Sequence, residues 1–347
     1  MSSANNRLAK KPNRLYELDC VRGLAALAVM LFHYTCRYRN LFGDSIIPRW
    51  MDFPIGRYGI EVFFILSGFV IIFTIKRNLS VQRFISKRFF RLYPTYWLCT
   101  IVTFTFVAVI GLPSREVTFG QFLINLSMLQ YGLKIKAVDG VTWALFMELM
   151  FYFYIAGILA IRQVSKIKWL CWAWFFLIVL KIFFPIPILK ILAIGDYGVF
   201  FIAGINFYHI YESSHLNRSC HLLNICCFVT ACALSETPLR IAAIVIMFTI
   251  FYFFAYGKLK WIVSNQLIFL GNISYPLYLL HQNIGYIFIK KTATLTGQPY
   301  LALLVPCLFS ILAAWIVYRF FEGAVVKKMQ DFFSKEGRRT GQPMVQN

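Results

Sequence analysis

Apolar segments about 20 residues long recur almost from one end of the chain to the other. A helix of that length crosses the hydrocarbon core of a bilayer, where helices and closed barrels alone satisfy their own backbone hydrogen bonds. The chain is 59% hydrophobic and 14% charged, whereas soluble domains are about 45–50% apolar and about 25% charged. We therefore predict an all-α polytopic membrane protein with no room for a separate soluble domain.

The hydropathy pattern predicts about ten transmembrane helices. A further stretch, residues 119–131, is amphipathic and too short to cross a bilayer, so we expect it to be interfacial or re-entrant. The predicted spans are residues 18–36, 58–75, 93–112, 141–161, 169–186, 190–211, 222–236, 239–256, 266–289 and 300–321.

The distribution of basic residues orients these spans. With the N-terminus in the cytoplasm, the cytoplasmic segments hold about twice as many Lys and Arg residues as the outer segments, as the positive-inside rule requires. We therefore expect both termini to be cytoplasmic. The predicted organisation is a basic N-terminal tail over residues 1–15, a transmembrane domain over residues 16–322, and a basic, partly disordered tail over residues 323–347.

The same topology explains the net charge of +21. Because no soluble domain is left to present a basic face, we expect membrane lipids as partners and no nucleic acid. The nine cysteines are mostly scattered through apolar runs, and the spacing of His209, His215 and His221 matches no zinc pattern. We predict no disulfide framework and no metal site.

Arg22 and His33 lie inside the first span. They are eleven residues apart, close to three helical turns, so they share one helix face at a separation of about 16 Å. A charged group within a membrane costs about 2.5–3.5 kcal/mol on insertion scales and is a functional candidate by default. Asp19, three residues before Arg22, is placed to pair with it, and such a pair could simply anchor the helix. His33 is suited to act as a general base, the alternative being a structural histidine bonded to a neighbouring helix.

Polar residues also occur within the second and fourth spans. The small pair Ser67-Gly68 permits close helix packing, and packing alone would explain Ser67. Glu61 lies near the outer end of the same span, where a merely interfacial role is open to it. Glu148 lies about two turns inside an otherwise apolar helix, so we treat it as a candidate for function.

A basic run leads into the third span and contains two arginines on one helix face. Arg88 and Arg91 are separated by one turn. Positive-inside topology accounts for part of this charge. A guanidinium pair at the mouth of a membrane bundle is also well suited to bind phosphate, because the group is planar, always charged and bidentate.

The ninth span carries a second deep histidine. His281 follows Asn272, Ser274 and Tyr278 on the same predicted helix. Polar side chains at this depth are candidates for binding a substrate or for supporting other site residues.

Taken in order, these residues resemble the membrane acyltransferase-3 family, which includes bacterial O-acetylases of O-antigen, exopolysaccharide and peptidoglycan. The resemblance runs from about Leu15 to Glu322 and depends on five motifs in sequence. The motifs are Arg22 with His33; Gly59, Phe63, Phe64, Ser67, Gly68 and Phe69; Arg88, Arg91 and Pro94; Trp143, Leu145 and Glu148; and Ser274, Tyr275, Tyr278, Leu279 and His281.

The resemblance implies a ten-span fold in the bacterial inner membrane, in a stand-alone form without a fused soluble domain. It implies acetyl-CoA as the cytoplasmic acyl donor, no permanently bound cofactor, and a hydroxyl of a glycan or lipid-linked glycan as acceptor. The family's catalytic histidine and its arginine partner map onto His33 and Arg22, and its cytoplasmic arginine pair maps onto Arg88 and Arg91.

The residues themselves suggest how such a reaction would run. Arg88 and Arg91, with Arg22, would hold the phosphates of the donor at the cytoplasmic mouth. His33 would take the proton of the acceptor hydroxyl or carry the acetyl group transiently. Glu148 is the first candidate to assist it. The remaining candidates for substrate binding or support are Ser67, Ser274, Tyr278 and His281.

Two other classes of protein share part of this pattern. A proton-coupled transporter or flippase of a glycan or small molecule would also place His, Glu and Arg within its spans, although we find no paired repeats of the kind such proteins often show. A purely structural subunit would need neither Arg22 nor His33. Transfer of label from acetyl-CoA to a glycan would separate the enzyme from both alternatives.

Overall fold

The computed structural model describes residues 14–43, 46–75, 80–184, 186–213 and 217–328. Within these ranges every regular element is helical, so the predicted all-α class is confirmed. The described helices of 15 residues or more each overlap one predicted span, although α4 begins 12 residues before its span and α9 begins 8 residues inside its span. They are α1 (Tyr16–Phe32), α3 (Gly59–Ile75), α4 (Val81–Ile110), α6 (Trp143–Ala160), α7 (Ile167–Phe183), α9 (Gly198–Glu212), α10 (Arg218–Ala233), α11 (Pro238–Ala255), α12 (Asn265–Thr296) and α13 (Pro299–Ile316).

Short helical elements connect or extend these helices, with η denoting 3-10 or π-helical turns. The π-helical η1 continues α1 directly into α2, so the first helix stays unbroken through His33. The short elements are η1 (His33–Arg37), α2 (Tyr38–Phe42), η2 (Arg49–Met51), η3 (Pro54–Tyr58), α5 (Phe119–Asn125), η4 (Gly140–Thr142), η5 (Val164–Lys166), α8 (Pro187–Leu192), η6 (Lys260–Ile262) and η7 (Val317–Glu322).

Six helical stretches among the described residues are long and apolar enough to cross a membrane. Of the other long helices, α7, α9 and α10 have 17, 15 and 16 residues. The fourth, α12, has 32 residues, but its polar side chains lower its hydropathy. A multi-pass membrane protein is thus supported, whereas the count of ten spans and the cytoplasmic termini stay predictions. The six stretches are Tyr16–Phe42, Arg49–Ile75, Val81–Ile110, Gly140–Ala160, Pro238–Ala255 and Pro299–Lys328.

Most of the two predicted tails, residues 1–13 and 329–347, lies outside the described residues. After η7 the helix continues to Lys328, past the predicted domain boundary at residue 322.

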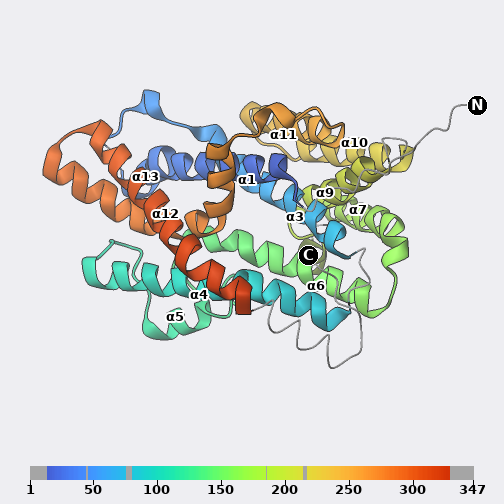
Figure 1. Cartoon of the computed structure of the whole chain (residues 1–347), viewed down its shortest axis with the longest axis horizontal. Coiled ribbons are helices and arrows are strands. Elements are labelled where there is room, and N and C mark those ends of the chain that lie inside the picture. The colour runs from blue at the N-terminus through green and yellow to red at the C-terminus, as the bar shows by residue number, and fades with distance from the viewer. Residues whose placement is uncertain (1–13, 44–45, 76–79, 185, 214–216, 329–347) are drawn as a thin grey trace, which may run out of the picture.

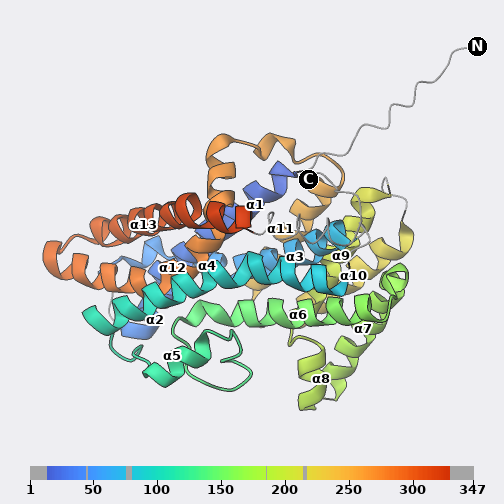
Figure 2. The same ribbon diagram turned by 60° about the horizontal axis from the view of Figure 1, so that its bottom comes forward.

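The amphipathic segment after α4 folds back along that helix (Figure 2). Its helix, α5, has only 7 residues, too few to cross a bilayer. Three aromatic side chains of α4 donate hydrogen bonds to the carbonyls of residues 125–127, at distances of 3.1, 2.6 and 2.8 Å; they are Tyr93, Tyr96 and Trp97. An interfacial or re-entrant segment therefore remains the best description.

Two helices, α9 and α12, are largely buried, and most of the other long helices pack around them (Figure 1). In α9 every residue from Gly198 to Ile210 is buried, and α3, α7, α10 and α11 pack around it. In α12 most residues from Gly271 to Ile289 are buried, and α1, α4 and α13 pack around it. Because α1 also contacts α3, the two groups of helices meet beside the first helix.

Glycines allow α1 and α12 to approach backbone to backbone. A Cβ atom on Gly271 would overlap the backbone of Asp19, and one on Gly23 would lie 2.6 Å from the nitrogen of Gly271. His33 and His281 also meet, ten residues further along each helix. The two helices therefore run parallel and keep one register for about 15 Å.

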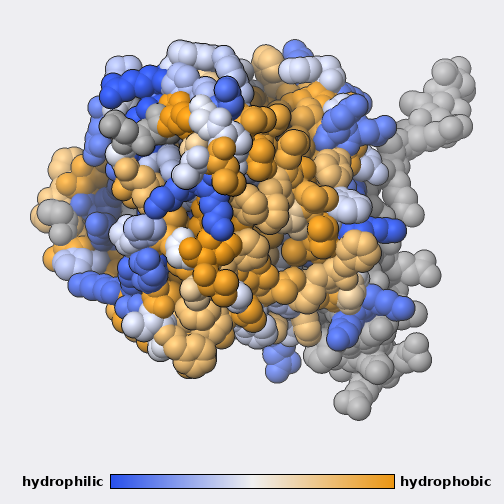
Figure 3. Space-filling model, turned by 90° about the vertical axis from the view of Figure 1, so that its left-hand side faces the viewer, coloured by the Kyte–Doolittle hydropathy of each residue, from blue (hydrophilic) through white to orange (hydrophobic). Residues whose placement is uncertain are grey.

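The predicted close packing at Gly68 is also observed. A Cβ atom there would overlap the carbonyl of Phe201, and one on Gly204 would overlap that of Ile65, so α3 and α9 touch through their backbones. The face shown in Figure 3 is largely apolar through its middle, with hydrophilic groups gathered mainly toward its left and right sides.

Candidate active site

Two imidazoles meet where α1 passes into η1. The Nδ1 atom of His33 lies 3.1 Å from Nε2 of His281. The ring centroids are 4.9 Å apart in an edge-to-face arrangement. His281 is fully buried, whereas His33 keeps some exposed surface. The structure thus brings together two candidate residues that lie 248 positions apart.

Glu148 on α6 is held by two hydroxyl groups. Its Oε1 atom accepts hydrogen bonds from the Ser67 hydroxyl at 2.6 Å and from the Tyr152 hydroxyl at 2.5 Å. Hydrogen bonds to a carboxylate are short and strong, so they fix the orientation of this group. Ser67 therefore has a polar partner as well as the packing role that the sequence suggested.

Arg88 on α4 is buried and tightly held. Its Nη2 donates to the Thr74 hydroxyl at 2.8 Å, and its guanidinium lies 5.5 and 5.4 Å from the ring centroids of Phe84 and Tyr152. Its Nε is buried and has no partner among the described residues. Arg91, one turn further along, is exposed, and its charge acts on Arg88.

Arg22 forms the predicted pair with Asp19. Its Nη1 lies 3.4 Å from Oδ1 of Asp19, and 22% of its side chain is exposed. Nε of Arg14 donates to the other Asp19 oxygen at 2.6 Å. This hydrogen bond raises the pKa of Arg14 above its ordinary value, so Arg14 stays charged. The Nη2 atom of Arg14 also donates to Asn272 on α12, next to the glycine crossing.

Arg91 on α4 thus lies within electrostatic reach of both Arg22 on α1 and Arg88 on its own helix. The charges of Arg91 and Glu148 act on both Arg22 and Arg88. We call Arg22, Arg88 and Arg91 the basic cluster. Planar guanidinium groups gathered in this way are suited to hold phosphate.

The hydroxyls of the two remaining predicted residues, Tyr278 and Ser274, donate to backbone carbonyls and not to other candidate residues. The ring of Tyr278 packs against His281 with centroids 5.9 Å apart, but its hydroxyl donates to the Val141 carbonyl at 2.6 Å. The Ser274 hydroxyl donates to the Gly271 carbonyl of its own helix at 2.7 Å. Tyr278 thus lies beside the imidazoles, while Ser274 takes part in the helix crossing.

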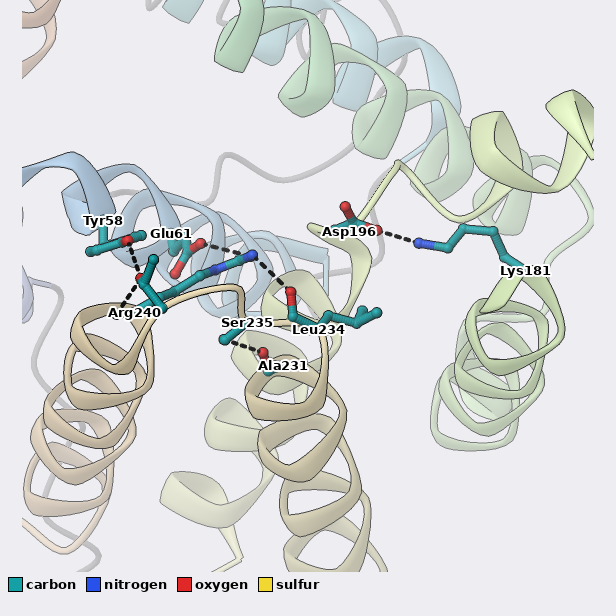
Figure 4. Close-up of polar contacts among 9 residues, drawn as sticks. Tyr58, Glu61, Lys181, Asp196, Ala231, Leu234, Ser235 and Arg240 are labelled. Atoms are coloured by element: carbon teal, nitrogen blue, oxygen red, sulfur yellow. Dashed lines mark hydrogen bonds and ion pairs between the residues drawn. The ribbon is translucent and has the colours of Figure 1, made fainter. Parts of the chain in front are cut away.

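The sequence left an interfacial role open for Glu61. The structure buries this residue in an ion pair at the N-terminal end of α3 (Figure 4). Its Oε1 lies 3.1 Å from Nη2 of Arg240, with 3% of the Glu61 side chain and 17% of the Arg240 side chain exposed. Nη1 of Arg240 donates to the Leu234 carbonyl at 3.3 Å. Oε2 of Glu61 and Nε of Arg240 have no partner among the described residues.

Sequence reasoning missed three residues that hold the candidate site. The Tyr34 hydroxyl lies 2.8 Å from the His281 carbonyl and 2.7 Å from the Ser310 hydroxyl. Thr74 holds Arg88, and Tyr152 holds Glu148. Only Tyr152 had a local signal, because it follows Glu148 by one helical turn. No group of side chains able to hold a metal ion occurs in the described part of the chain.

These features define a class of protein: a helical membrane bundle with two contacting imidazoles inside it and a cluster of guanidinium groups about three helical turns away along α1. The model of an acyltransferase domain, acyltransferase-3, matches residues 15–319. The chain therefore belongs to the acyltransferase-3 family of membrane acyltransferases, as its motifs indicated.

Two named relatives match parts of the chain. Acyltransferase MdmB of Streptomyces mycarofaciens is 31% identical over 174 residues, which cover 46% of this chain and 43% of MdmB. Exopolysaccharide production protein ExoZ of Rhizobium meliloti (strain 1021) is 33% identical over 111 residues, which cover 30% of this chain and 35% of ExoZ. The matched regions thus span less than half of either relative. No solved structure is significantly similar to the chain.

Proposed function

We propose that the protein is an O-acetyltransferase of the bacterial inner membrane. It would move an acetyl group from cytoplasmic acetyl-CoA to a hydroxyl of a cell-surface glycan, such as O-antigen or exopolysaccharide, free or linked to a lipid carrier. The observation that carries the proposal is the contact of His281 on α12 with His33, which continues the helix that bears Arg22. The similarity to ExoZ, an exopolysaccharide production protein, supports a glycan acceptor.

The basic cluster is the proposed donor site. Nε of Arg88 is buried and has no hydrogen-bond partner within the described ranges, and Arg91 is exposed one turn further along. Like charges repel, so an anion bound among the three guanidinium groups would lower their electrostatic energy. The phosphates of acetyl-CoA supply that anion. Glu148 and Asp19 offset part of the charge when no donor is bound.

The separation between Arg22 and His33 determines how the donor lies. Along α1 the two residues are about 16 Å apart. A donor whose phosphates rest on the basic cluster would extend its pantetheine arm along α1 and bring the thioester to His33. The acceptor hydroxyl would then reach His33 from the opposite end of the first helix.

The proposed reaction needs one base and no external redox partner. His33 takes the proton of the acceptor hydroxyl as its oxygen attacks the thioester carbonyl carbon. The new C–O bond forms, the C–S bond breaks, and the proton passes to the leaving thiolate, giving CoA and the O-acetylated glycan. A two-step route through acetyl-His33 reaches the same products.

The test uses purified full-length protein in lipid nanodiscs with radiolabelled acetyl-CoA and a lipid-linked or polymeric glycan. His33→Ala should abolish labelling of the glycan, whereas His221→Ala, a histidine on α10 away from the imidazole pair, should retain it. Wild-type labelling by His33→Ala would refute the proposal. Transport of glycan across proteoliposomes without acetylation would instead identify a transporter.

A further inference from the structure

The hydrogen bonds around His281 fix which of its nitrogens carries the proton. Its Nδ1 lies 3.0 Å from the Leu277 carbonyl and 2.9 Å from the Tyr278 carbonyl. A backbone carbonyl accepts hydrogen bonds and cannot donate them, so the proton must lie on Nδ1. In the uncharged ring, Nε2 of His281 is then a bare acceptor that points at His33.

The same reasoning applies to His33. Its Nδ1 lies 2.8 Å from the Val29 carbonyl, so this nitrogen also carries the proton. The N–H is shared between the Val29 carbonyl and Nε2 of His281 in a three-centre arrangement. The lone pair of the uncharged His33 ring is therefore on Nε2, for which the described residues provide no hydrogen-bond partner.

We infer that His281 is a positioning residue, and that Nε2 of His33 is the nitrogen that takes the acceptor proton or the acetyl group. This inference rests on the proposed function. When Nε2 of His33 gains the hydroxyl proton, the positive charge spreads over the ring, and the shared N–H bonds become charge-assisted. His281 accepts that stronger bond. It cannot pass the proton onward, because its own N–H is directed at two carbonyls.

The surrounding backbone holds both rings in this geometry. The α-helix widens into the π-helical η1 at His33, and such π-turns are frequent at functional sites. The next residue, Tyr34, is fully buried and reaches the carbonyl of His281 and the hydroxyl of Ser310. A Cβ atom on Gly285 would overlap the Tyr34 side chain, so this position must lack one. Both imidazoles are thus fixed by neighbouring contacts.

Three variants test the role of His281. A glutamine side chain places its amide near the position of Nε2, so His281→Gln should keep an acceptor for His33 and retain kcat within about tenfold. His281→Phe keeps the apolar volume but removes the acceptor, and should lower kcat by about 10²-fold or more. The KM for acetyl-CoA should stay within about twofold, because the basic cluster is unchanged. His221→Phe is the matched control: it makes the same substitution at a histidine of α10, outside the imidazole pair, and should preserve kcat.

A spectroscopic measurement tests the proton positions without any assay of activity. The chain has 5 histidines, so ¹⁵N-histidine labelling gives a small set of signals, and those lost in His33→Ala belong to His33. In the uncharged wild-type ring we expect a protonated Nδ1 and a bare Nε2. A protonated Nε2 would overturn the inference, and it can be read even if His281→Phe does not fold.

The kinetic outcomes separate this inference from the proposed function. Loss of activity in His281→Phe with retention in His281→Gln supports the positioning role. Full activity in a folded His281→Phe overturns it while leaving His33 as the base. Full activity in His33→Ala would refute the proposed function itself.

Discussion

The buried ion pair between Glu61 and Arg240 yields a prediction that needs no knowledge of the substrate. Arg240→Met would leave the Glu61 carboxylate with 3% of its side-chain surface exposed and no other ion-pair or hydrogen-bond partner among the described residues. Removing one member of a buried pair costs about 3–5 kcal/mol, because the other charge stays buried and unpaired. We therefore expect Arg240→Met to lower the Tm of the purified protein by several degrees.

The double variant distinguishes the unpaired charge from lost packing. Glu61→Met combined with Arg240→Met removes both charges and fills a similar volume, and replacements of this kind are often neutral or stabilising. The double variant should therefore recover most of the Tm lost by Arg240→Met. Because Asp196 is 53% exposed, Asp196→Asn breaks only an exposed pair with Lys181, and should cost less than about 1 kcal/mol.

The assay is thermal unfolding in nanodiscs, followed by tryptophan fluorescence at one fixed scan rate so that irreversible unfolding affects all variants alike. A Tm for Arg240→Met equal to that of the wild type would refute the reasoning. A double variant no more stable than Arg240→Met would show that packing, and not the unpaired carboxylate, accounts for the loss.

Three further predictions concern the crossing of α1 and α12, the basic cluster and the Ser274 hydroxyl. Gly271→Val would force α12 away from α1, and should destabilise the protein by about 1–3 kcal/mol and lower acetylation; an unchanged Tm in thermal unfolding would contradict the close crossing. Arg91→Gln should raise the KM for acetyl-CoA by about tenfold at low salt, whereas Arg83→Gln on the same helix should not; steady-state kinetics would show equal KM values if the basic cluster does not bind the donor. Ser274→Ala should leave kcat within about twofold, because its hydroxyl bonds to its own helix; a large fall in kcat would place that hydroxyl in the reaction.

The sequence correctly predicted the features that depend on the residues of a single helix. The apolar runs coincide with helices, the pair of Asp19 with Arg22 lies within one turn, and Gly68 marks a close crossing. Each of these follows from the period of an α-helix and the size of a side chain. The family also follows from motifs that keep their order along the chain.

The partners of the polar residues could not be predicted, because they lie on other helices. His33, Arg88 and Glu148 occur in or next to apolar segments, so the sequence shows that each needs a polar partner. It does not show which side chain is that partner. The partner of His33 depends on the register of α1 and α12, which close backbone contact at their glycines determines. The Ser274 hydroxyl is an exception, because it donates to the Gly271 carbonyl three residues earlier on its own helix.

The contact between α1 and α12 also determines when, during synthesis of the chain, the histidine pair can form. His281 is synthesised 248 residues after His33, which at about 5–20 residues per second corresponds to roughly 12–50 s of translation. Throughout that interval the newly inserted first helix carries an imidazole whose eventual neighbour does not yet exist. The histidine contact is therefore among the last parts of the molecule to be completed, and a nascent chain that stops before α12 holds the basic cluster without the imidazole pair.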